Sequence, residues 1–141
     1  MLNVLFLCTG NSCRSQMAEA IAKRELQSAN FYSAGIETHG MNLYAVKVCE
    51  ELGLDMSQAT SKLVSDIDVE FDIVLTVCDH AAESCPMILT KARRVHHSFQ
   101  DPPKLVKDIE DEQEKLKIYR LVRDEIKSYL TTEFKKTLKG E

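Results

Sequence analysis

Residues 8–15 place a nucleophile, a flexible loop and a fixed positive charge close together. The segment reads Cys-Thr-Gly-Asn-Ser-Cys-Arg-Ser. A thiolate is a strong nucleophile, and the planar guanidinium of Arg14 suits bidentate capture of a tetrahedral oxyanion. Gly10 permits close approach of the backbone, and Asn11 tolerates a left-handed conformation. The residue types and their spacing therefore predict attack by Cys8 on a bound oxyanion.

The elements around this loop would position it for that chemistry. An unbroken apolar run at residues 4–7 is typical of a buried parallel strand, and residues 15–27 have helical periodicity. The backbone N–H groups at the start of a helix attract anions and favour a thiolate. We therefore expect Cys8 to be largely ionised at neutral pH, with Ser15 donating its hydroxyl to the sulfur. A buried cysteine beside a surface arginine is the alternative interpretation.

The rest of the chain alternates between strand and helix patterns. Further strands are expected at residues 30–33, 72–77 and 94–98, helices at 41–52 and 111–138, and one helical turn within 60–66. This alternation predicts an α/β fold with a parallel sheet in a single domain, residues 1–141. Such sheets bind ligands beyond the carboxyl ends of their strands. The last helix should pack through a seam of apolar residues, namely Tyr119, Val122, Ile126, Leu130 and Phe134.

Composition narrows the class of protein. The net charge of −4 argues against a general nucleic-acid binder, which usually carries a basic excess. No apolar stretch approaches the ~20 residues of a membrane helix. The N-terminal apolar run is short and has no positive residue before it, so we expect a cytoplasmic protein without a signal peptide. We also expect a monomer. Thiols stay reduced in that compartment.

Two further cysteines follow the third predicted strand. Cys78 ends the strand, and Cys85 comes shortly after it, with His80 between them. Zinc would want four ligands and these residues supply three, so a redox pair or two unrelated buried cysteines remain as alternatives. Cys49 lies on the inner face of the second helix and is expected in the core. Cys13 either packs the loop or shields Cys8 by an off-pathway disulfide.

The loop resembles that of the low-molecular-weight protein tyrosine phosphatases and of their relatives, the thiol-dependent arsenate reductases. Residues 15–19, 33–40 and 123–126 resemble the reductase branch, whereas the phosphatases usually carry proline where Gln16 stands. The resemblance covers nearly the whole chain. It implies a four-stranded parallel flavodoxin-like sheet in the order 2-1-3-4, with helices on both faces. Cys8 and Cys78 would then end adjacent strands ~4.8 Å apart, within the ~4.4–6.8 Å Cα separation of disulfides.

The resemblance also implies a reaction. Arsenate, with phosphate or sulfate as analogues, would be reduced to arsenite by attack of Cys8 and a disulfide relay through Cys78 and Cys85. Asp101 would be the general acid. The substrate would be bound by loop residues, namely Thr9, Gly10, Asn11, Ser12, Cys13, Arg14 and Ser15. No metal or bound cofactor is expected. Electrons would come from a thioredoxin-type dithiol, which the Cys78–Cys85 pair favours over a glutaredoxin.

The chain departs from the family pattern at several positions. Pro103 stands where phosphatases often carry an aromatic residue, and His97 where the reductases often carry tryptophan. In some reductases a potassium ion near the loop is held by an asparagine, a serine, a threonine and an aspartate. The matching residues here are Asn11, Ser33, Thr60 and Lys62. Since lysine cannot ligate a cation, we hypothesise that the Lys62 ammonium replaces the ion and bonds the same carbonyl and hydroxyl oxygens. A solvated surface lysine is the alternative.

Three other classes of function stay open at this point. A phosphatase acting on phosphate esters would use Cys8 and leave Cys78 and Cys85 idle. A non-catalytic redox or oxyanion sensor could use the same thiols without turnover. An interaction protein has only the acidic run at residues 108–114 in its favour, and that run is more simply the start of a helix.

Overall fold

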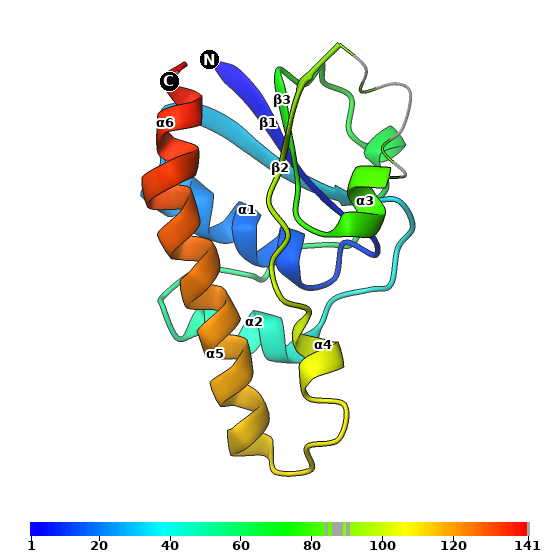
Figure 1. Ribbon diagram of the computed structural model, residues 1–141, viewed down its shortest axis with the longest axis vertical. Coiled ribbons are helices and arrows are strands. Elements are labelled where there is room, and N and C mark those ends of the chain that lie inside the picture. Colours follow the sequence, from blue (N-terminus) through cyan, green and yellow to red (C-terminus); the bar gives the residue numbers. More distant parts are fainter. Residues whose placement is uncertain (84, 86–88, 90, 141) are drawn as a thin grey trace.

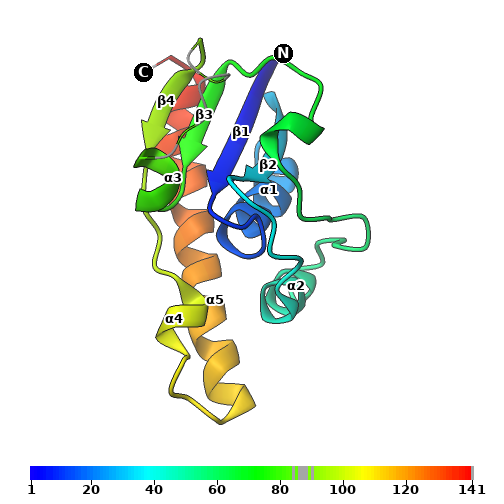
Figure 2. The same ribbon diagram turned by 90° about the vertical axis from the view of Figure 1, so that its right-hand side faces the viewer.

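A four-stranded parallel sheet forms the centre of the protein. The computed structural model describes residues 1–83, 85, 89 and 91–140. The strands are β1 (Leu2–Cys8), β2 (Ala29–Gly35), β3 (Ile73–Thr76) and β4 (Arg93–His96). Their order is β2-β1-β3-β4, as predicted, and Figure 2 shows the sheet face-on. The apolar run of β1 is explained by its central place, since residues 4–7 are fully buried.

Helices cover both faces of the sheet. They are α1 (Arg14–Glu25), α2 (Leu43–Glu50), α3 (Asp79–Glu83), α4 (Pro102–Leu105) and α5 (Glu112–Tyr129). Figure 1 shows α1 and α5 on one side of the sheet and α3 on the other, as expected. Helix α2 is shorter than the predicted 41–52. It begins after Asn42, whose side chain accepts hydrogen bonds from two backbone N–H groups, and it is followed by Gly53 at a φ of 80°.

The prediction of one unbroken helix over 111–138 is wrong in its middle. A π-helical turn, η3 (Leu130–Phe134), separates α5 from a final helix, α6 (Lys135–Leu138). The hydroxyls of Thr131 and Thr132 donate to the carbonyls of Lys127 and Ser128, at 2.8 and 2.6 Å. Such hydroxyls compete with the α-helical ladder and widen a turn locally. The predicted seam is nevertheless confirmed, because every residue in it is buried.

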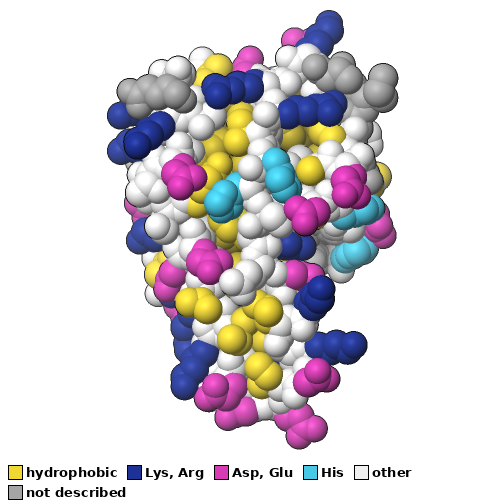
Figure 3. Space-filling model, in the orientation of Figure 1, with side chains coloured by type: hydrophobic (Ala, Val, Ile, Leu, Met, Phe, Trp, Pro, Cys, Tyr) yellow, Lys and Arg dark blue, Asp and Glu magenta, His cyan; other side chains and the backbone are white. Residues whose placement is uncertain are grey.

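The strand boundaries differ from the predictions by a few residues. Strand β2 is longer than 30–33 because it pairs with β1 along its whole length, from Ala29 to Gly35. Strand β4 begins one residue before 94 and ends at His96, and the predicted turn within 60–66 is a 3-10 turn, η1 (Val64–Asp66). Among the helices described, none is both long and apolar enough to cross a membrane. Basic and acidic side chains are interspersed on the face drawn in Figure 3.

Candidate active site

The sulfur of Cys8 lies at the carboxyl end of β1 and receives two short contacts from the following loop. Cys8 is 5% exposed. Its Sγ is 2.8 Å from the Ser15 hydroxyl and 3.2 Å from the backbone nitrogen of Asn11, which donates to it. Both contacts come from within residues 8–15, so the predicted loop closes around the sulfur.

The surrounding network orients the Asn11 amide toward Ser15. The backbone N–H of Lys62 can only donate, and it lies 2.9 Å from Asn11 Oδ1. The amide of Asn11 therefore turns its Nδ2 toward Ser15 Oγ, at 2.8 Å. Ser15 accepts this bond and keeps its own hydrogen available for Cys8, 2.8 Å away. The Ser15 hydroxyl and the Asn11 backbone N–H thus both lie within hydrogen-bond distance of one sulfur.

Gln16 holds Asn11 in the conformation that this network needs. Asn11 is fully buried and has a φ of 48°, in the left-handed region. Gln16 Nε2 lies within 3.1 Å of the Asn11 carbonyl, 2.9 Å of Asn11 Oδ1 and 2.9 Å of the Thr60 carbonyl. From the sequence, Gln16 was notable only because the phosphatases usually carry proline at its position. The sequence signal for this role was the position of the Gln16 amide next to the apolar stripe of the first predicted helix.

Gly35 is a second residue that the sequence analysis missed. A Cβ built at Gly35 would lie 2.8 Å from both the Thr9 carbonyl oxygen and the Asn11 nitrogen. These are backbone atoms of the loop in residues 8–15, and the Asn11 nitrogen donates to Cys8 Sγ. The chain after β2 then runs beside the loop, since Ile36 and Glu37 donate to the carbonyls of Cys8 and Thr9. Glycine is therefore required where β2 meets the loop.

Arg14 and Asp101 lie close together at the rim of the loop. Arg14 Nη1 donates to the Phe99 carbonyl at 2.9 Å, and Nη2 lies 3.8 Å from Asp101 Oδ1. The Arg14 side chain is 14% exposed and that of Asp101 is 41% exposed. The Phe99 bond orients the guanidinium, while the loose pairing and partial exposure leave the Asp101 carboxyl accessible for proton transfer.

Cys78 lies beside the end of β1, because β1 and β3 are neighbours. The backbone N–H of Val77 donates to the Leu7 carbonyl at 3.0 Å, which places Cys78 next to the start of the loop. Cys78 Sγ is 3.3 Å from the Thr9 hydroxyl, and that hydroxyl is also 3.1 Å from His80 Nδ1. A cysteine from another strand therefore contacts the residue that follows Cys8.

The other three cysteines occupy different surroundings. Cys85 is partly buried against the core, and burial raises the pKa of its thiol while Arg94 opposes the rise. Among the described residues, no hydrogen bond joins Cys85 to Cys78. Cys49 is fully buried, as predicted, and burial raises its pKa to about 12. Burial also raises the pKa of Cys13 far above its ordinary value, which favours the packing role.

Lys62 reaches one of the oxygen atoms that the sequence analysis assigned to it. Its Nζ donates to the Thr60 carbonyl at 2.9 Å and lies 4.0 Å from Glu19 Oε1. Ser33, however, donates its hydroxyl to Glu19, a residue absent from the predicted set. Burial lowers the pKa of the Lys62 ammonium, and Glu19 opposes that effect. The ammonium thus lies between a carbonyl and a carboxylate beneath the loop.

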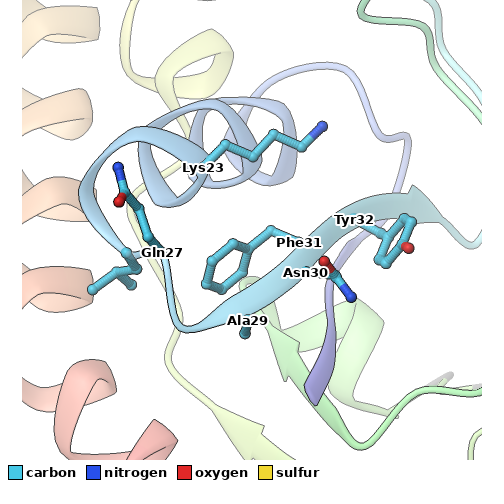
Figure 4. A pocket seen from close by; sticks show the side chains of 7 residues that line it. Lys23, Gln27, Ala29, Asn30, Phe31 and Tyr32 are labelled. Atoms are coloured by element: carbon cyan, nitrogen blue, oxygen red, sulfur yellow. The ribbon is translucent and has the colours of Figure 1, made fainter. Parts of the chain in front are cut away.

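Other features do not compete with this site. Within residues 1–83, 85, 89 and 91–140, no three His, Cys, Asp or Glu side chains form a group that could hold a metal ion, so the zinc alternative gains no support. A hollow of about 480 Å³ lies between the end of α1 and the first half of β2. Figure 4 shows Lys23, Gln27 and Phe31 at this hollow, away from the carboxyl ends of the strands.

Comparisons with known proteins find similarity in both the sequence and the fold. The low molecular weight phosphotyrosine protein phosphatase family matches residues 3–141. An arsenate reductase of Bacillus licheniformis is 49% identical over 87% of this chain and 88% of its own. One from Halalkalibacterium halodurans is 45% identical over 92% of both chains. A solved structure described as an arsenate reductase in the phosphate binding state superposes with a TM-score of 0.77 and 27% identity, covering 96% of this chain and 98% of the other.

Proposed function

The chain belongs to the low molecular weight phosphotyrosine protein phosphatase family, and we propose that it reduces arsenate to arsenite through a relay of three thiols. The observation that carries this proposal is the position of Cys78. Its Sγ lies 3.3 Å from the hydroxyl of Thr9, the residue that follows Cys8. Ester hydrolysis needs one thiolate and an acid, whereas reduction needs a second thiol within reach of the first. The similarity to proteins named arsenate reductase supports the same choice.

The first step uses the loop as an anion site. Arsenate binds to the backbone N–H groups of residues 9–15 and to the fork of Arg14, which the Phe99 carbonyl orients. The Cys8 thiolate, stabilised by Ser15 and by the Asn11 N–H, attacks arsenic in line with a departing hydroxyl. Asp101 gives that hydroxyl a proton, and it leaves as water. An S–As bond now joins Cys8 to pentavalent arsenic.

The second and third steps move electrons and then the disulfide. The Cys78 thiolate attacks Cys8 Sγ, so that an S–S bond forms and the S–As bond breaks. The electron pair of that bond stays on arsenic, which leaves as trivalent arsenite. Cys85 then attacks Cys78 Sγ and releases Cys8 as a thiolate, a good leaving group. We propose that a thioredoxin-type dithiol supplies two electrons and two protons to reduce the Cys78–Cys85 disulfide.

The test is arsenate-dependent oxidation of NADPH with thioredoxin and thioredoxin reductase supplied. We expect a small amount of the protein to consume a large excess of arsenate, with one NADPH oxidised per arsenite released. Replacing thioredoxin with glutaredoxin and glutathione is the control for the reductant. An absence of NADPH oxidation with both reductants would contradict the proposal.

Phosphate ester hydrolysis is a second candidate. The Arg14–Asp101 pair supports it as well, because ester hydrolysis needs the same oxyanion site and acid as arsenate reduction. We expect weak hydrolysis of an aryl phosphate, since arsenate and phosphate share shape and charge. Comparing kcat/KM for ester hydrolysis with that for arsenate reduction ranks the two activities. A higher value for the ester would make the phosphatase the main function.

We also propose that the Lys62 ammonium takes the place of a potassium ion beneath the loop. Its contact with the Thr60 carbonyl and its position 4.0 Å from Glu19 support this. We expect arsenate turnover to be the same in potassium and sodium chloride at equal ionic strength. In the Lys62→Asp variant, potassium should raise turnover several-fold over sodium, because a carboxylate can ligate the ion. Several-fold activation of the parent protein by potassium would contradict the idea.

A further inference from the structure

The Thr9 hydroxyl joins a thiol that must lose a proton to an imidazole that could accept one. Thr9 Oγ1 lies 3.3 Å from Cys78 Sγ and 3.1 Å from His80 Nδ1. Cys78 is 4% exposed, whereas His80 is exposed on α3. Water therefore has little access to the sulfur but reaches the imidazole. The three groups form a path from a buried thiol to solvent.

The hydrogen-bond capacities of the three groups allow the path to work in both protonation states. A hydroxyl donates one hydrogen and accepts others, and a neutral imidazole accepts at one nitrogen. When Cys78 is a thiol, it donates to Thr9, which donates to His80 Nδ1. When Cys78 is a thiolate, the order reverses, so that protonated Nδ1 donates to Thr9 and Thr9 donates to sulfur. The same heavy-atom positions serve both states, with only the hydrogens moving.

The carboxylate next to His80 in the chain, that of Asp79, is paired with another histidine. Asp79, the adjacent carboxylate, lies 3.0 Å from His96 Nε2 on β4. His96 Nδ1 is in turn within 3.1 Å of the Thr76 carbonyl. The carboxylate nearest to His80 along the chain is therefore engaged by a different histidine. The first three residues of α3 thus contain a carboxylate tied to β4 and an imidazole turned to the loop.

We propose that His80 accepts the proton of Cys78 through the Thr9 hydroxyl, and that this generates the thiolate that attacks Cys8. The thiol hydrogen passes to Thr9 Oγ1 as the hydroxyl hydrogen passes to His80 Nδ1, and the exposed imidazole later releases it to water. Thr9 touches the reacting sulfur, and His80 acts through Thr9. This inference rests on the proposed function only for the fate of the thiolate, because the proton path itself needs no arsenate.

The rate of Cys78 alkylation by iodoacetamide, followed by peptide mass spectrometry, tests the path without arsenate. At pH 7 we expect His80→Gln and Thr9→Val to slow alkylation by about 10- to 30-fold, because an unassisted thiol is only a few per cent ionised there. At pH 10 the variants and the parent should react at equal rates, since hydroxide then ionises the thiol. Thr9→Ser keeps the hydroxyl and should keep the parent rate at pH 7. His97→Gln, a histidine stacked on Tyr129, is the matched control and should also react like the parent.

Two results would overturn the inference. One is an equal alkylation rate at pH 7 in His80→Gln and the parent. The other is a uniform slowing at both pH values, which would indicate lost access to the sulfur. With arsenate, His80→Gln should slow formation of the Cys8–Cys78 disulfide in a single turnover by the same factor of about 10 to 30, because both reactions consume the Cys78 thiolate. Suppose that alkylation changes as expected while neither the parent protein nor any variant reduces arsenate. In that case the proposed function is wrong and the proton path is still supported.

Discussion

Replacing Cys8 with serine is expected to abolish arsenate turnover, whereas the same change at Cys78 or Cys85 should stop the reaction at a defined stage. Cys8→Ser removes the only atom proposed to bond to arsenic. Cys78→Ser should form the arsenic adduct and stop, because no thiol is in place to break the S–As bond. Cys85→Ser should complete one reduction and retain a Cys8–Cys78 disulfide. Arsenite release per protein molecule, with mass spectrometry of the trapped species, distinguishes the three results.

Cys49→Ala is the matched control for this series. Cys49 is fully buried and packs α2 against the core. Its loss should reduce stability by about 1 kcal/mol or slightly more and leave the turnover number unchanged. Full turnover in Cys85→Ser with thioredoxin supplied would show that the relay ends at Cys78. Full turnover in Cys78→Ser would show that Cys78 takes no part in the relay, and would contradict the proposed second step.

Arg14→Lys should lower kcat/KM for arsenate by about 100- to 1,000-fold, the cost of removing one oriented donor from an oxyanion site. Lysine keeps the charge, but its point-like ammonium lacks the planar fork that binds an oxyanion bidentately. It also cannot keep the geometry in which Nη1 donates to the Phe99 carbonyl while Nη2 faces Asp101. Steady-state kinetics across arsenate concentrations measure the loss.

Arg24→Lys, on the exposed part of the same helix, is the control for Arg14→Lys. Arg24 donates to the Leu52 carbonyl and to Glu25, away from the loop, so this change should leave kcat/KM unaltered. Far-ultraviolet circular dichroism and a thermal melt establish that both variants fold. A loss of less than about tenfold in Arg14→Lys would mean that charge alone binds arsenate, and that the fork contributes under about 1.4 kcal/mol.

The predicted chemistry and elements came from local patterns. The apolar run of β1 had to be a buried strand, and the glycine and asparagine after it had to turn the chain before α1. Cys8, Arg14 and Ser15 therefore lie close together where the chain passes from the end of β1 to the start of α1. The alternation of strands and helices predicted the parallel sheet for the same reason, because hydrophobic periodicity is a property of neighbouring residues.

Contacts between distant segments could not be predicted in this way. Gln16 donates to the Thr60 carbonyl, 44 residues away. The Lys62 N–H donates to Asn11 across 51 residues, and Arg14 donates to the Phe99 carbonyl across 85. The hydrophobic periodicity of one segment does not determine which carbonyl of a distant segment will contact it. The requirement for glycine at position 35 has the same origin, because it comes from backbone atoms of the loop rather than from the β2 sequence.

The sequence by itself predicted the nucleophile, its loop and the alternation of elements, because these predictions depend on residues close together in the chain. Only the tertiary structure decided which groups complete the site. The β1–β3 pairing brings Cys78 to Thr9 and lets α3 present His80 to the same hydroxyl. Parallel strands are joined by long crossovers, so their carboxyl ends meet only when the sheet forms. The hydrogen-bond network around the reacting sulfurs is therefore a product of packing.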